Sequence, residues 1–233
     1  MRTGEIIERI QSLYSKGVKS DDSRLSNRHI YAKIKTVRTR LITQEIKKKQ
    51  RVSDWNYQTI PCVKLIEVPV HECPCVPPLG CTILRSKNKL PKVLTGFTED
   101  LIQSVTSVDR SLKIDRVNIN AVNSQKGNKY TSKKVNYFIL NEYLYITTPT
   151  KMKVVTIRGL FEDPIEVATS LYDCQGETES TICIDYMDTE FKIDSDMIDT
   201  LVEISLQELL VIFSQGVEDI TNNTRDSLIE KSK

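Results

Sequence analysis

Hydrophobic residues recur at helical spacing in three parts of the chain. Near the start, Thr3 can cap a short helix that carries Ile6, Ile7 and Ile10 on one side. A second, longer helix is predicted over residues 26–51, beginning at Ser26, with an apolar stripe of Ile30, Ile34, Val37, Leu41 and Ile46. The third helix is predicted over residues 195–215, where the apolar face is so broad that it must be buried against other helices or another subunit.

Strand patterns fill the middle of the chain. Residues 135–140, 143–147 and 152–159 are rich in Val, Ile, Tyr and Thr and are joined by the turns Asn141-Glu142 and "TPTK", which predicts an antiparallel meander. Upstream, six prolines between residues 61 and 91 limit residues 62–68 and 81–85 to short edge strands. Thr98, followed by Glu99 and Asp100, predicts a short helix to about residue 108.

Together these patterns predict an α+β fold in which the helices dominate. We expect a helical bundle, made from the N-terminal helices and the long C-terminal helix, with a small antiparallel β-sheet. Along the chain this gives an N-terminal helical part (1–60), a Pro/Cys-rich loop with the meander (61–160), and an acidic helical part with a tail (161–233). At 233 residues the three parts are expected to form one composite domain.

Charge is segregated along the chain although the net charge is only +2. Residues 1–60 hold 14 Lys and Arg against 6 Asp and Glu, and residues 61–159 hold 15 against 7. Residues 160–233 reverse the sign, with 4 against 18. The acidic third can therefore neutralise basic surface of its own chain, or pair with the basic face of a neighbouring copy.

Four of the six cysteines lie close together in a proline-rich segment. Cys62, His71, Cys73, Cys75 and Cys81 could supply zinc ligands, but Cys73 and Cys75 are one residue apart and a second C-x2-4-C pair is missing. The N-terminus does not resemble a signal peptide, which indicates a reducing compartment and makes a disulfide the least favoured reading. Buried structural thiols in a loop are favoured over zinc, and no metal or other cofactor is expected.

Motifs for catalysis are missing from the sequence. There is no nucleophile elbow, Gly-rich phosphate loop or H-E-x-x-H motif, and the two histidines lie in unlike settings. We therefore expect no catalytic residues, and no run of the ~20 apolar residues needed to cross a membrane occurs. The basic helix 26–51 could instead contact phosphates without reading bases, so a DNA-binding accessory protein stays open as an alternative function.

Several segments carry a resemblance to a known family. "RLSNRHIYAKIKTVRTRLITQE" followed by "DWNYQTIPCVKLIEVP" resembles the N-terminal part of virion structural proteins of crAss-like and related short-tailed bacteriophages. "YFILNEYLYI" and "IRGLFEDPIEV" resemble the hairpin and strand-to-helix corner of the same proteins. The resemblance covers roughly residues 20–215.

The resemblance implies a head–tail connector, also called a ring, adaptor or collar protein. Such proteins form closed rings, commonly of twelve copies, between the portal and the tail, and extend the channel through which genomic DNA passes. It also implies a protein made in the cytoplasm of the host bacterium and built into the virion. The partners expected are sister copies, the portal protein, adjacent ring and tail proteins and, without sequence specificity, DNA.

Residues expected at these interfaces come from the basic helix and the C-terminal helix. We expect the N-terminal helices to dock on a neighbouring subunit or ring, the meander to offer strand edges between subunits, and the C-terminal helix to contact the portal or the next ring. The residues predicted for partner contacts are Arg28, Lys33, Arg38, Arg40, Leu201, Leu209 and Ile212.

Overall fold

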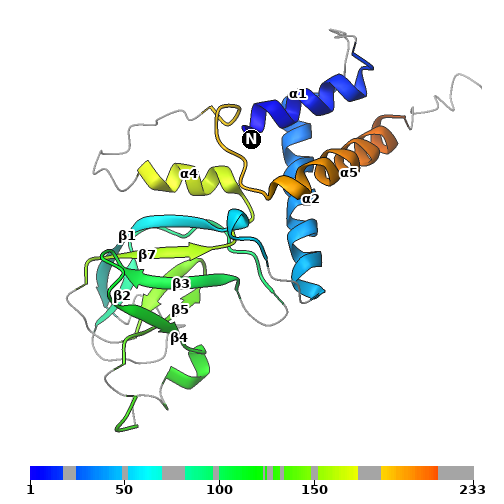
Figure 1. Cartoon of the computed structure of the whole chain (residues 1–233). Helices are drawn as coiled ribbons and strands as arrows, with labels where there is room; N and C mark the ends of the chain where they lie inside the picture. The colour runs from blue at the N-terminus through cyan, green and yellow to red at the C-terminus, as the bar shows by residue number, and fades with distance from the viewer. Residues whose placement is uncertain are drawn as a thin grey trace, which may run out of the picture.

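The strands of this protein close into a barrel, and a layer of helices packs beside it (Figure 1). The computed structural model describes residues 1–17, 25–48, 52–69, 82–96, 100–122, 124, 128–131, 134–147, 152–172 and 185–214. The helices in these ranges are α1 (Thr3–Tyr14), α2 (Asn27–Lys47), α4 (Pro164–Tyr172) and α5 (Ser195–Ser214), with short 3-10 turns at Asp54–Asn56 and Ile119–Ala121.

The barrel consists of seven described strands. They are β1 (Gln58–Pro69), β2 (Thr82–Ser86), β3 (Ile102–Ser107), β4 (Lys113–Arg116), β5 (Asn136–Leu140), β6 (Tyr143–Ile146) and β7 (Val154–Gly159). Around the barrel they follow the order β1-β2-β6-β5-β4-β3-β7, and only the β4–β5 pair is parallel. Its interior is filled by alternating aliphatic side chains, among them Val105, Leu144, Val155 and Ile157, none of which is exposed.

The predicted fold class, a helical bundle with a small sheet, is therefore wrong. The local strand patterns of β5, β6 and β7 and the Asn141-Glu142 turn are confirmed, and both turn residues have positive φ, as a tight hairpin turn requires. The predicted meander of these three strands is wrong, because β7 pairs with β1 and β3 rather than with β6. A closed barrel also leaves no free edge among the described strands, which contradicts the expected strand edges between subunits.

Two segments account for the error. The segment predicted as a helix near residues 98–108 forms β3, because Ile102–Ser107 pairs with β7 on one side and β4 on the other. The first strand of the proline-rich segment, β1, is longer than the piece predicted over 62–68, whereas the short strand predicted over 81–85 is confirmed as β2. Pro61 falls in a register shift between Ile60 and Val63, where an irregular ladder tolerates a residue without an N–H.

The helical layer consists of α1, α2 and α5, which pack on one another around a core of their own. Ser26 caps α2 by accepting from the backbone N–H of His29 at 3.3 Å, as predicted. The segment before α5 pairs with the N-terminus, since Thr3 N–H donates to Thr189 and Gly4 N–H donates to Met187. A small cluster of Ile42, Leu94 and Leu160 joins the end of α2 to the barrel.

None of the described helices is both long and apolar enough to span a membrane.

Candidate functional site

Arg38 lies at the joint between the helical layer and the barrel, and its side chain is completely buried. Its guanidinium donates from Nε to the carbonyl of Lys192 at 2.6 Å, from Nη1 to that of Phe161 at 2.8 Å, and from Nη2 to that of Asn56 at 3.4 Å. Burial lowers the pKa of this guanidinium to about 10. Three backbone segments are therefore held by one side chain, and a planar five-donor group suits that geometry.

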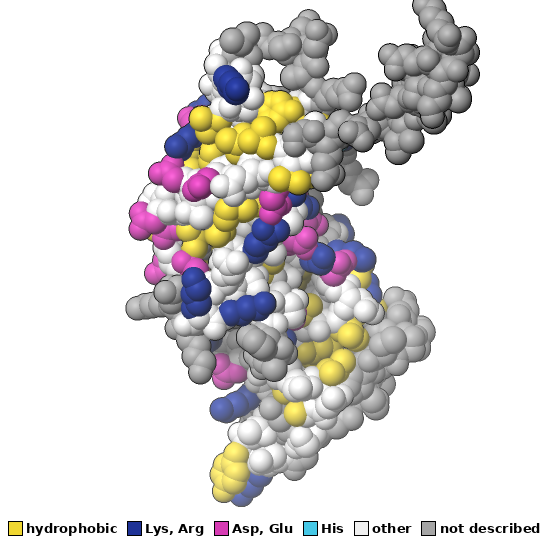
Figure 2. Space-filling view, turned by 90° about the vertical axis from the view of Figure 1, so that its right-hand side faces the viewer, with side chains coloured by type: hydrophobic (Ala, Val, Ile, Leu, Met, Phe, Trp, Pro, Cys, Tyr) yellow, Lys and Arg dark blue, Asp and Glu magenta, His cyan; other side chains and the backbone are white. Residues whose placement is uncertain are grey.

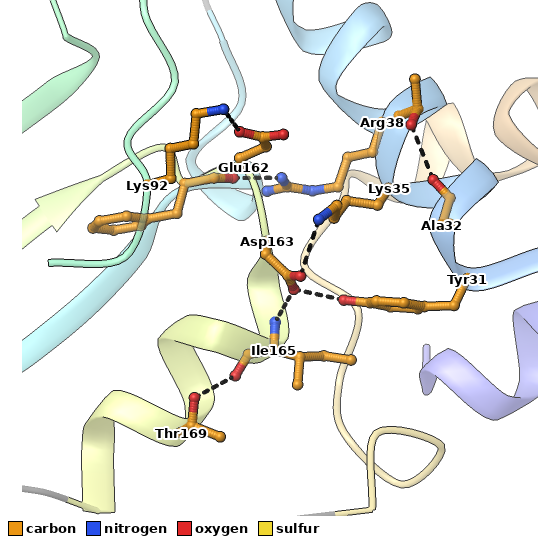
Figure 3. A network of polar contacts seen from close by, with 11 residues as sticks. Tyr31, Ala32, Lys35, Arg38, Lys92, Glu162, Asp163, Ile165 and Thr169 are labelled. Carbon is orange, nitrogen blue, oxygen red and sulfur yellow. Dashed lines mark hydrogen bonds and ion pairs between the residues drawn. The ribbon is translucent and has the colours of Figure 1, made fainter. Parts of the chain in front are cut away.

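A second polar contact lies one to two turns earlier on α2 (Figure 3). Tyr31 donates its hydroxyl to Asp163 at 2.6 Å, and Lys35 lies 3.3 Å from the other carboxylate oxygen. Asp163 also accepts from the N–H of Ile165 at 2.9 Å, so it caps α4 while Pro164 occupies the first helical position. Burial and this hydrogen bond raise the pKa of Tyr31 above its usual value, which keeps the hydroxyl protonated.

The third contact joins α2 to α5. Glu208 of α5 binds Lys33 through one carboxylate oxygen and Arg40 through the other, each at 2.5 Å. Both cations hold the pKa of Glu208 below its usual range. Lys33 and Glu208 also line a shallow surface hollow of about 410 Å³ with Gln207, Val211 and Ile212.

Four cations of the basic helix are engaged within its own chain. Lys33 and Arg40 bind Glu208, Lys35 binds Asp163, and Arg38 binds backbone carbonyls. Both carboxylates, Asp163 and Glu208, come from the acidic third of the sequence. This third therefore pairs with basic side chains of its own chain, which is one of the two roles expected for it. These contacts leave fewer cations on α2 for the phosphates of DNA.

The residues predicted for partner contacts fall into two groups. Arg38, Leu201 and Leu209 are buried inside the subunit, while Lys33 and Arg40 are ion-paired with Glu208. Arg28 and Ile212 are exposed, and no partner for the Arg28 guanidinium lies within the described ranges. The described subunit therefore leaves Arg28 and Ile212, and part of Arg40, for contacts with another chain.

Hydrophobic side chains remain on the surface at the C-terminal end of α5. Leu210, Val211 and Ile212 are 43%, 59% and 53% exposed. Next to them Phe213 packs against the rings of Tyr14 and His29, with ring centroids 6.4 and 6.1 Å apart. Figure 2, which faces the side on which α5 ends, shows hydrophobic side chains in the upper half of the molecule with acidic and basic side chains beside them.

The cysteine cluster lies mostly outside the described residues. Residues 70–81, with His71, Cys73, Cys75 and Cys81, are among those not described, but Cys62 in β1 is disulfide-bonded. This corrects the expectation that a disulfide is the least favoured state of the cysteines. A disulfide sulfur is not available as a thiolate ligand, so Cys62 drops out of the zinc alternative. Within the described ranges, no three side chains form a group that could hold a metal.

The sequence matches a family model described as "Phage tail ring protein 2" over residues 5–228. The chain belongs to this family of crAss-like phage ring proteins. The resemblance noted from the sequence is thereby confirmed. As a tail ring protein, the chain is a structural component of the phage virion that assembles with other tail components. No curated protein matches the sequence.

Sequence reasoning missed the residues that bind the cations of α2. Tyr31 and Glu208 were not singled out, although Glu208 lies at helical spacing from Leu201, Ser205 and Ile212. A carboxylate at the border of an apolar helical face is a signal for an ion pair with the next helix. The burial of Arg38 also had a signal in the sequence. Arg38 stands in the series Ile30, Ile34, Arg38, Ile42, and residues four apart on a helix share one face, here the apolar one.

Proposed function

We propose that this ring protein is a head–tail connector, an adaptor that joins the portal to the tail and extends the DNA channel of the virion. Its subunits form a closed homo-oligomeric ring, for which we propose twelve copies, stacked between the portal and an adjacent ring or tail protein. The role is structural, with no reaction catalysed. The ring sits at the head–tail junction, and its subunits are made in the host bacterium before assembly.

The observation that carries this proposal is the family match over residues 5–228, nearly the whole chain. Two features of the subunit support it. Exposed apolar residues at the end of α5 need a partner surface, since patches of this kind mark interaction sites. The buried contact of Arg38 and the partly buried contact of Asp163 fix the helical layer on the barrel, which suits a subunit that transmits load within an assembly.

Contact with DNA in the channel is proposed to be passive. A wall past which DNA slides needs no base-specific contact, and four cations of α2, Lys33, Lys35, Arg38 and Arg40, are engaged within the subunit. We expect any affinity for duplex DNA to be weak and steeply dependent on salt.

Electron microscopy tests the proposal directly. Negatively stained protein, alone and with the portal and the neighbouring ring protein, is expected to show annular particles that seat on the portal. Protein that stays monomeric at high concentration and in the presence of the portal would overturn the proposal. A monomer that binds duplex DNA, with binding lost steeply as salt rises, would support the alternative of a DNA-binding accessory protein.

A further inference from the structure

Two surfaces on opposite sides of the subunit carry complementary charge. One is the outward stripe of α5, which we define by five exposed residues, Asp196, Asp199, Glu203, Leu210 and Val211. The three acidic residues are spaced three to four residues apart, and Leu210 follows seven residues after Glu203, which is about two turns of the helix. From Asp196 to Val211 the stripe is about 22 Å long at 1.5 Å per residue. It is acidic over its first two turns and apolar at its end.

The other surface lies on the outside of the barrel, on β1 and β2. We call it the lysine flank and define it as Lys64, Ile66, Arg85 and Lys87. Ile66 is paired directly with Arg85, and Lys87 donates its backbone N–H to the carbonyl of Lys64 at 2.8 Å, so the two lysines face each other across neighbouring strands. Both lysines are exposed, and no carboxylate lies within ion-pair distance of either among the described residues.

Placing two lysines opposite each other destabilises a pair of strands. The flank adds a third cation, since the guanidinium of Arg85 stacks 4.7 Å above the ring of Tyr143. Beside it Ile66 is 36% exposed, which gives the flank an apolar spot next to its charges. A partner with carboxylates and aliphatic side chains would relieve the repulsion and cover Ile66.

The acids of the α5 stripe are only partly neutralised within the subunit. Asp199 pairs with Arg9 at 2.8 Å, while Glu203 accepts from the amide of Gln207 at 3.3 Å, and Asp196 has no cation within ion-pair distance in the described part. The stripe therefore retains negative charge beside Leu210 and Val211. The carboxylates of the stripe complement the lysines of the flank, and its aliphatic end can cover Ile66.

Within one subunit the two surfaces do not meet. Figure 1 shows β1 and β2 on one side of the molecule and α5 on the other. A ring built by repeating one contact needs two different surfaces that fit each other, placed far apart on the subunit. We propose that the α5 stripe of one copy docks on the lysine flank of the next copy. This inference rests on the proposed ring, and it names the surfaces that join its subunits.

Charge reversal in both surfaces tests the proposal. The variants are Lys64→Glu/Lys87→Glu and Asp196→Lys/Glu203→Lys, and the control Lys113→Glu/Lys129→Glu reverses two exposed lysines outside the flank. Each reversed variant alone is expected to lower the fraction of protein in annular particles about tenfold, because like charges then face each other. The control is expected to assemble as the wild type does, and the melting temperature of each purified variant shows that the subunit still folds.

Mixing the two reversed variants gives the decisive result. In a ring of alternating variants, every stripe again faces a flank of opposite charge, so the equimolar mixture is expected to recover annular particles. Reversed variants that assemble alone as well as the wild type, or a mixture no better than its parts, would overturn the proposal. The proposal would also be overturned if the Lys64→Glu/Lys87→Glu variant formed normal rings but lost binding to duplex DNA, because the lysine flank would then be a DNA contact. If the wild type never forms rings, the proposed function fails as well.

Discussion

The guanidinium of Arg38 in α2 donates a hydrogen bond of 2.8 Å to the backbone carbonyl of Phe161, two residues after the end of β7. Both residues are fully buried. The contact ties α2 to the end of a barrel strand, and with two further carbonyls it satisfies a charge that would otherwise be isolated in the core. Arg38 thus fixes the orientation of the helical layer on the barrel together with the Tyr31–Asp163 contact and the cluster of Ile42, Leu94 and Leu160.

Replacing Arg38 is therefore expected to destabilise the subunit. Arg38→Met leaves the carbonyls of Lys192 and Phe161 without a donor and should lower the free energy of unfolding by roughly 3 kcal/mol. Arg38→Lys should recover only part of this, because an ammonium cannot reproduce the planar fork. Urea unfolding measures both. Arg28→Met, at an exposed position of the same helix, is the control; equal losses at the two positions would contradict the assignment.

The contact between Tyr31 and Asp163 is expected to contribute on its own. Tyr31→Phe removes one hydrogen bond to a carboxylate and should cost about 1 to 2 kcal/mol of unfolding free energy. Asp163→Ala should cost more, because the carboxylate also pairs with Lys35 and caps α4. A double-mutant cycle from chemical denaturation gives the coupling between Tyr31 and Asp163, and a coupling of zero would show that the hydrogen bond adds nothing.

The ion pairs of Glu208 predict a pH dependence. Lys33 and Arg40 lower the pKa of Glu208 in the folded state, so this group stabilises the fold above the pKa that it has in the unfolded chain. That stabilisation is lost as the pH falls through the lowered folded pKa. The melting temperature of Glu208→Gln should thus lie below that of the wild type at neutral pH, and the two should converge in acid. A difference that is the same at all pH values would mean that the charge of Glu208 has no part in it.

Gly4 is predicted to tolerate no larger side chain. A Cβ at this position would lie 2.9 Å from the carbonyl oxygen of Met187, which already accepts from the backbone N–H of Gly4 at 2.8 Å. Gly4→Ala should therefore destabilise by roughly 1 to 3 kcal/mol, although alanine normally favours a helix. Thermal unfolding is the measurement, with Glu8→Ala on the exposed side of α1 as control. A stabilised Gly4→Ala variant would show that the backbone near Met187 can move to accommodate the added methyl group at little cost.

The state of Cys62 is expected to show in its reactivity. A disulfide-bonded sulfur does not react with iodoacetamide, so the peptide that contains Cys62 should stay unlabelled until the unfolded protein is reduced. Mass spectrometry with and without reductant checks this. Labelling of Cys62 in unfolded, unreduced protein would restore it as a free thiol and reopen the zinc alternative.

Local patterns were enough where neighbours in sequence decide the structure. Ser26 and the isoleucine series predicted α2, and the Asn141-Glu142 turn predicted the β5–β6 hairpin. Arg38 shows the limit of such reasoning, because it was grouped with Arg40 as a surface cation although it interrupts the series Ile30, Ile34, Ile42. Whether an arginine at that position points to solvent or into the fold depends on carbonyls that lie 18 to 154 residues away.

The sequence by itself determined the long helices, the hairpin, the segregation of charge and the family of the protein, since each of these is written in spacing, turn residues or motifs along the chain. Only the tertiary structure decided that the strands close into a barrel, that Arg38 is an internal residue, and that Lys64 and Lys87 face each other without a carboxylate between them. The physical reason is that strand pairing and ion pairing join residues far apart in sequence. Hydrophobic periodicity and secondary-structure propensity are properties of a few neighbouring residues. They do not indicate which distant strand or charged residue will pair with a given one.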